Sequence, residues 1–163
     1  MIYYTIVKQQ FGGFCMWSKT RSIILSRIVN FIFISLILLG SLFLPKIVCQ
    51  YIYFTSKSQS LYFSLLITLY LAVVPCLTLL ICLERLLVNI QKDNVFVNRN
   101  VTLLRIISWC CFAVSIIFAV FGFYYLLSLF IAIAAAFFGL ILRVIKNIFD
   151  KAIVIKTEND FTV

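Results

Sequence analysis

Residues 106–142 read IISWCCFAVSIIFAVFGFYYLLSLFIAIAAAFFGLIL, a run of 37 residues without a charge. As one α-helix this run would be about 55 Å long, nearly twice the roughly 30 Å hydrocarbon core of a bilayer. It must therefore fold back on itself. We predict the turn at residues 122–125, because Gly122 loosens the helix and the aromatic residues around it suit a membrane interface. The stretch thus predicts two spans joined by a tight helical hairpin.

Two more uncharged runs precede this stretch. Residues 28–45 are uncharged over 18 positions and residues 58–83 over 26, and each is long enough for one crossing at about 1.5 Å per residue. A chain that is 64% hydrophobic and 12% charged has too little polar surface for an ordinary soluble domain. The sequence predicts an all-α integral membrane four-helix bundle, with spans at about 25–45, 60–83, 101–122 and 126–148.

The cationic side chains are unevenly distributed between the apolar runs. Of the 14 lysines and arginines, four precede the uncharged run 28–45, two lie between it and the run 58–83, four lie between that run and residues 106–142, none lies in the hairpin turn, and four follow residue 142. Cytoplasmic loops of membrane proteins are rich in Lys and Arg. We therefore predict an N-in/C-in topology, with a cytosolic N-terminal segment at 1–22, a four-span domain at 23–155 and a cytosolic tail at 156–163.

The same charges indicate the kind of partner. The cations stand singly beside apolar runs and do not form a basic face with polar readout residues, so direct nucleic-acid binding is not expected. All five acidic residues also fall on the predicted cytoplasmic side. The predicted lipid partner is a bilayer with an anionic inner leaflet. A homo-oligomer is left open.

The sequence lacks the groups that membrane enzymes and proton carriers use. The chain has no histidine, and the predicted spans hold no ionisable group in their interior. The six cysteines form no C-x-x-C motif and are interpreted as small apolar residues, with palmitoylation of Cys15 and redox use of Cys110 and Cys111 left open. We predict no enzyme activity, no catalytic residues, no cofactor and no metal.

Small residues recur along three of the spans and predict close helix packing. They are Ser64, Thr68, Ala72 and Cys76 in the second span, Ser108, Cys111, Ser115, Ala119 and Gly122 in the third, and Ser128, Ala132, Ala136 and Gly139 in the fourth. The hairpin should bring the last two sets face to face.

Near the start of the first span, Arg27 and Asn30 are interpreted as an interfacial anchor, with a functional polar site as the alternative. Pro75 predicts a kink, which either adjusts the helix shape or forms a gate.

The segment between the second and third spans is the most specific polar sequence. Residues 84–92 can continue the second helix, and Asn98 or Asn100 suits the N-cap of the third. The last helix should continue to about Ile155, after which the polar tail should fray. The candidate partner-docking residues lie in these two segments: Glu84, Arg85, Phe96, Asn100, Arg105, Glu158, Asn159, Asp160 and Phe161.

Both segments resemble a known family. They read LERLLVNI at 83–90, NVF at 94–96, Asn100, LRI at 104–106 and ENDFTV at 158–163, and they resemble the bacterial four-span membrane proteins of domain of unknown function 2975. Phe161 and Val163 stand where the family usually has leucine and isoleucine, and Thr157 stands where an acid is common. The resemblance implies a bacterial membrane protein of unsettled activity, often encoded beside a small helix-turn-helix regulator.

These observations lead to two hypotheses about function. The first is a non-enzymatic, multi-pass protein of the bacterial inner membrane whose cytosolic loop and tail dock a cytosolic partner, such as a small helix-turn-helix regulator. The alternative is a small transport or permeability component, or an immunity protein against a membrane-active peptide. A transport path would have to be lined by Ser64, Thr68, Ser108 and Ser115, the polar side chains available in the spans.

Overall fold

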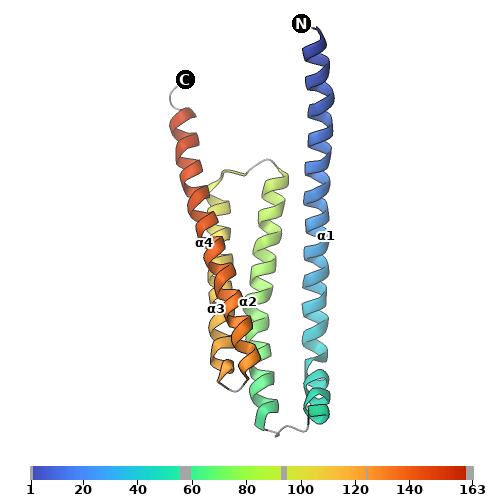
Figure 1. Ribbon diagram of the computed structural model, residues 1–163, viewed down its shortest axis with the longest axis vertical. Coiled ribbons are helices and arrows are strands. Elements are labelled where there is room, and N and C mark those ends of the chain that lie inside the picture. Colours follow the sequence, from blue (N-terminus) through green and yellow to red (C-terminus); the bar gives the residue numbers. More distant parts are fainter. Residues whose placement is uncertain (1, 56–59, 93–94, 124, 161–163) are drawn as a thin grey trace.

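The computed structural model describes the backbone of residues 2–55, 60–92, 95–123 and 125–160, and the side chains from residue 21 to 159 apart from residues 55–60, 93–94 and 124. This part of the chain forms four helices: α1 (Ile2–Thr55), α2 (Ser60–Gln91), α3 (Asn98–Gly122) and α4 (Leu126–Asp160) (Figure 1). Each contains a segment long and apolar enough to cross a membrane. The predicted all-α architecture with four spans is therefore confirmed, and the chain is a multi-pass membrane protein.

The predicted hairpin is present where the sequence placed it. Helix α3 ends at Gly122 and α4 begins at Leu126. The turn between them is closed by backbone hydrogen bonds, in which Tyr125 N donates to Phe121 O at 3.1 Å and Ser128 N donates to Tyr125 O at 3.0 Å. A connection this short forces α3 and α4 to lie antiparallel and adjacent.

The small residues of the hairpin face one another, as predicted. Three serine hydroxyls donate across the helix pair: Ser108 Oγ to Gly139 O at 2.8 Å, Ser115 Oγ to Ala132 O at 2.8 Å, and Ser128 Oγ to Phe118 O at 3.0 Å. At Gly139 the helices are so close that an added Cβ would lie 3.3 Å from Cys111 Cβ. Small side chains allow this approach. Each serine hydroxyl donates to a backbone carbonyl, because the hydrocarbon of the bilayer offers it no hydrogen-bond partner.

The four helices are arranged in chain order. Helix α1 packs on α2, α2 on α3, and α3 most extensively on α4, whereas the described residues of α1 make no close backbone contact with α3 or α4 (Figure 1). The buried apolar cluster, Cys82, Leu86, Leu103, Leu104 and Ile107, lies between α2 and α3 and is covered by residues of α4. Helix α1 therefore stands at the edge of the assembly, with most of its apolar side chains exposed.

Two helices are longer than the sequence predicts. Helix α1 continues through Pro45 to Thr55, so most of the segment after Pro45 that the predicted span boundary leaves as an external loop is helical. Proline has no N–H to donate to the carbonyl four residues earlier, and here Tyr70 of α2 donates its hydroxyl to that carbonyl, Ser41 O, at 3.1 Å. Helix α4 runs five residues beyond Ile155, to Asp160, so the first residues of the tail are helical.

Candidate functional site

A polar cluster joins α1 to α2 at the end of the molecule where the 92–97 loop lies. Arg27 Nε contacts Glu84 Oε1 at 2.7 Å, and a second nitrogen of the same guanidinium donates to Gln91 Oε1 at 2.8 Å. Glu84 and Gln91 are two helical turns apart and so lie on one face of α2. The side chains of Arg27 and Glu84 are 31% and 15% exposed. This ion pair is therefore partly desolvated and bridges two helices.

Asn30 completes the cluster one turn along α1. Its Nδ2 donates to Glu84 Oε2 at 3.2 Å and to Leu80 O at 3.1 Å, and the residue is 3% exposed. The Glu84 carboxylate thus receives hydrogen bonds on both oxygens, as a half-buried charge requires. Among the described residues, Asn30 Oδ1 is buried without a hydrogen-bond partner, which weakens the gain from this contact.

The cluster was not found by sequence reasoning. The sequence indicates an interfacial anchor at Arg27, with a functional polar site as the alternative, and a docking surface at Glu84, but in the structure each is the other's partner. They are 57 residues apart in the chain. The available signal was their opposite charge at the same predicted depth on adjacent antiparallel spans, since charges near a membrane are usually paired.

The loop between α2 and α3 is held by Asn100. This residue is 0% exposed; its Oδ1 accepts from Asn89 Nδ2 at 2.7 Å, and its Nδ2 donates to Val95 O at 2.8 Å. The predicted N-cap role of Asn98 or Asn100 is wrong, because Val97 occupies the N-cap of α3 without a side-chain hydrogen bond. The backbone N–H of Asn100 donates to Val97 O, whereas the side chain of Asn100 turns toward Asn89 of α2.

The other candidate residues of the loop are at the surface. Phe96 is 46% exposed and its ring lies 5.9 Å from the ring of Phe149 in α4, measured between centroids. Arg85 and Arg105 are exposed on α2 and α3. Phe96 therefore brings the loop into contact with the extension of α4.

The tail candidates lie apart from the loop. Glu158 and Asn159 are exposed in the last turn of α4, nine residues beyond Phe149, which corresponds to a rise of about 13 Å. Thr157 Oγ1 donates to Ile153 O at 3.0 Å and Val154 O at 2.8 Å, within the same helix. The side chain of Asp160 and the whole of Phe161 are outside the described residues. Within the described part, the candidates thus form two groups, one at the loop and one at the end of α4.

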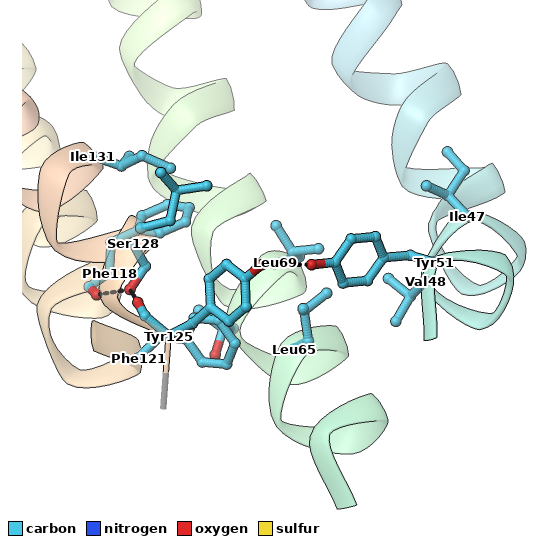
Figure 2. Close-up of a pocket in the computed structure, with 12 residues that line it drawn as sticks. Ile47, Val48, Tyr51, Leu65, Leu69, Phe118, Phe121, Tyr125, Ser128 and Ile131 are labelled. Carbon is cyan, nitrogen blue, oxygen red and sulfur yellow. Dashed lines mark hydrogen bonds between the residues drawn. The ribbon is translucent and has the colours of Figure 1, made fainter. Parts of the chain in front are cut away.

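At the opposite end of the bundle, a cavity of about 340 Å³ separates α1 from the hairpin. Its lining is apolar apart from a few hydroxyls, among them those of Tyr51 and Tyr125, which lie 2.7 Å apart. Figure 2 shows these two rings pointing toward each other from α1 and from the hairpin turn. The edge helix is therefore fastened at two levels, by the Arg27 ion pair near its middle and by the Tyr51 contact near its C-terminal end.

Within the residues whose side chains are described, no three His, Cys, Asp or Glu residues are grouped as metal ligands. Three of the four hydroxyls needed for a transport path donate to backbone carbonyls, namely Thr68, Ser108 and Ser115. A hydroxyl used in this way is less able to solvate a passing solute.

Comparison with known proteins agrees with the resemblance seen in the sequence. Residues 31–163 match the family described as "Protein of unknown function (DUF2975)". The chain belongs to the DUF2975 family. No curated protein and no solved structure matches it. In this DUF2975 chain the matched residues include Glu84, Asn100 and Phe96, whereas Arg27 and Asn30, which hold Glu84, precede the matched residues.

Proposed function

We propose that this DUF2975 protein is a non-enzymatic docking protein of the bacterial inner membrane. Both termini and the 92–97 loop lie in the cytoplasm, where they hold a cytosolic partner such as a small helix-turn-helix regulator. The observation that carries this proposal is the 5.9 Å contact between Phe96 and Phe149, because it joins the loop to the part of α4 that extends past the span. The loop is thereby joined to the start of the α4 extension, and the tail candidates begin about 13 Å further along the same helix.

The end of α4 indicates the chemistry of the partner. Val154 and Ile155 are 54% and 65% exposed, and Glu158 lies in a last turn that contains no basic residue. A carboxylate is unfavourable at the negative end of a helix dipole by about 0.3–1 kcal/mol. A partner with an apolar patch bordered by Lys or Arg would bury Val154 and Ile155 and place its cations near the Glu158 carboxylate. A DNA-binding regulator presents cations of this kind, and docking them here would keep it from DNA.

Crosslinking in cells tests the proposal. A photoreactive amino acid is placed at Phe96 or at Ile155, and at Leu42, which is 75% exposed in the middle of the α1 span, as the matched control. We expect the same cytosolic protein to be captured from Phe96 and Ile155 and only lipid from Leu42. Lipid adducts alone at all three positions would count against docking.

The N-in/C-in orientation makes its own prediction. Reporter fusions after Lys92 and Val163 should be cytoplasmic, and one after Gln50 should be external, because twelve of the cations then face the cytoplasm and two do not. Paired phosphatase and fluorescent-protein reporters measure the side directly. An external signal at Lys92 would contradict the orientation.

The tail provides a prediction about binding. We expect Phe161→Ala to weaken partner capture more than Glu158→Ala does. An exposed ion pair contributes about 0–1 kcal/mol, whereas burying an apolar side chain contributes about 1.5–3 kcal/mol. Deleting residues 158–163 should abolish capture while membrane levels stay normal, as read by quantitative pull-down and immunoblotting. Normal capture by the deleted protein would remove the tail from the docking surface.

A further inference from the structure

A second polar site lies between α3 and α4, at the end of this helix pair that is far from the 122–125 turn. Here Arg105, Ser108, Trp109, Arg143, Lys146 and Asn147 line a hollow of about 200 Å³. Three of these six residues are cationic and none is acidic. Lys146 pairs with Asp150 one turn further along α4, and its Nζ lies 3.4 Å from Asn147 Oδ1. The hollow is therefore a predominantly positive site within a helix pair that is otherwise apolar.

Arg105 and Arg143 have guanidinium N–H donors that are available to a ligand. Arg143 lies over the ring of Trp109, with its Cζ 5.8 Å from the ring centroid. Within the part of the chain that the structure describes, neither guanidinium takes part in a hydrogen bond or an ion pair. A guanidinium carries five N–H donors in a planar fork that matches the oxygens of a phosphate group. Two such forks at one hollow are suited to a phosphate.

The position along the helices agrees with a phospholipid headgroup. Arg105 lies 17 residues before Gly122, and Arg143 lies 17 residues after Leu126. Both are thus about 26 Å from the hairpin turn. With that turn at one face of a hydrocarbon core roughly 30 Å thick, the arginine backbones lie about 4 Å below the opposite face, and their long side chains can extend to the headgroups. Trp109, 61% exposed, lies one turn deeper in the membrane than Arg105.

An apolar surface continues from the hollow toward the middle of the membrane. Phe112 lies edge-on to Trp109, with 6.3 Å between ring centroids, and its ring covers the backbone at Gly139. Two turns beyond Trp109, Ile116 is 65% exposed on the same helix. Acyl chains attached to a phosphate in the hollow would lie along this surface, whereas a free phosphate would not use it.

We propose that this hollow binds the phosphate of an anionic phospholipid, with Arg105 and Arg143 as the principal ligands. The shared chemistry of the site is phosphate recognition, and the apolar surface assigns the phosphate to a lipid. Of the six residues that line the hollow, Arg105 is also a docking candidate, and the lipid site does not depend on the proposed partner docking. With the proposed orientation, the lipid belongs to the inner leaflet.

Quenching of Trp109 fluorescence by brominated lipids tests the proposal. The chain has two tryptophans, so Trp17→Phe leaves Trp109 as the single reporter. The protein is reconstituted in vesicles that mix phosphatidylcholine with phosphatidylglycerol, with either lipid brominated on its chains. We expect brominated phosphatidylglycerol to quench Trp109 with a preference of about 25-fold, since each of the two arginines contributes about fivefold. Equal quenching by the two lipids would overturn the proposal.

Matched variants distinguish the site from the general positive field of the protein. Arg105→Gln/Arg143→Gln should remove the preference, whereas Lys92→Gln/Arg99→Gln, which removes the same charge from exposed positions, should retain it. Equal losses in both variants would overturn the site. Quenching by brominated phosphatidylcholine at or above the level of the parent protein shows that a variant is inserted. Should the Gln pair fail to insert, Arg105→Lys/Arg143→Lys keeps the charge without the fork, and a full preference there would overturn the arginine assignment.

A final arm separates the two sources of phosphate. Millimolar inorganic phosphate is added to the reconstituted protein during the titration. A lipid held by headgroup and chains together should keep its preference for Trp109. Loss of the preference would assign the hollow to free phosphate and overturn the lipid assignment.

Discussion

Replacing Ala132 with phenylalanine is expected to lower the free energy of unfolding by about 3 kcal/mol, the upper end of the usual cost of overpacking. Ala132 is 3% exposed and its carbonyl accepts the hydroxyl of Ser115 at 2.8 Å. A benzyl group at this position would push α3 and α4 apart and break that hydrogen bond. Detergent unfolding, followed by circular dichroism or by thermal loss of monodispersity, measures the change.

The neighbouring residue provides the control. Ile133 is 60% exposed, so Ile133→Phe adds similar bulk toward lipid and should change stability by less than about 0.5 kcal/mol. Ala136, which is half-buried on the same face as Ala132, should give an intermediate loss when changed to phenylalanine. Equal stability of the Ala132 and Ile133 variants would show that the hairpin does not depend on this face.

The hairpin could be predicted because its constraints are local and strong. A run of 37 uncharged residues cannot cross once, and Gly122 marks a turn near its middle. The small-residue faces followed from helical periodicity and the antiparallel connection. The number of spans thus follows from the length of the uncharged run, and the packing face follows from the spacing of small residues along each helix.

The extent of α1 and the position of the ion pair could not be predicted in this way. Pro45 and Lys46 resemble a helix end, yet the helix continues because the Tyr70 hydroxyl from another helix reaches the carbonyl that Pro45 leaves free. Hydropathy gives the depth of Arg27 and Glu84 but not the rotation of each helix about its axis. That rotation follows from packing between residues distant in the chain, and it decides whether the two charges meet.

The second large effect is expected at this ion pair. Arg27→Leu should destabilise the protein by about 2 kcal/mol, because it leaves the Glu84 carboxylate half-buried with Asn30 as its remaining partner in the cluster. Breaking a fully buried pair costs about 3–5 kcal/mol, and the 31% exposure of the Arg27 side chain reduces that figure through solvent screening. The intrahelical pair of Lys146 and Asp150 provides the comparison, since its acidic side chain is 43% exposed and Asp150→Asn should cost about 0.5 kcal/mol or less.

A double-mutant cycle separates attraction within the pair from the penalty of an unpaired charge. Arg27→Leu/Glu84→Leu should recover most of the stability lost in Arg27→Leu, because apolar replacements of a desolvated pair are often neutral. We expect an interaction energy of about 1–2 kcal/mol from the cycle. Additive single effects would mean that the two charges do not interact, and α1 would then be held to α2 by apolar contacts and by hydrogen bonds such as that of Asn30 to Leu80 O. A large interaction energy would instead make Glu84 a structural residue that joins α1 to the start of the loop, and its contribution to docking would act through the position of that loop.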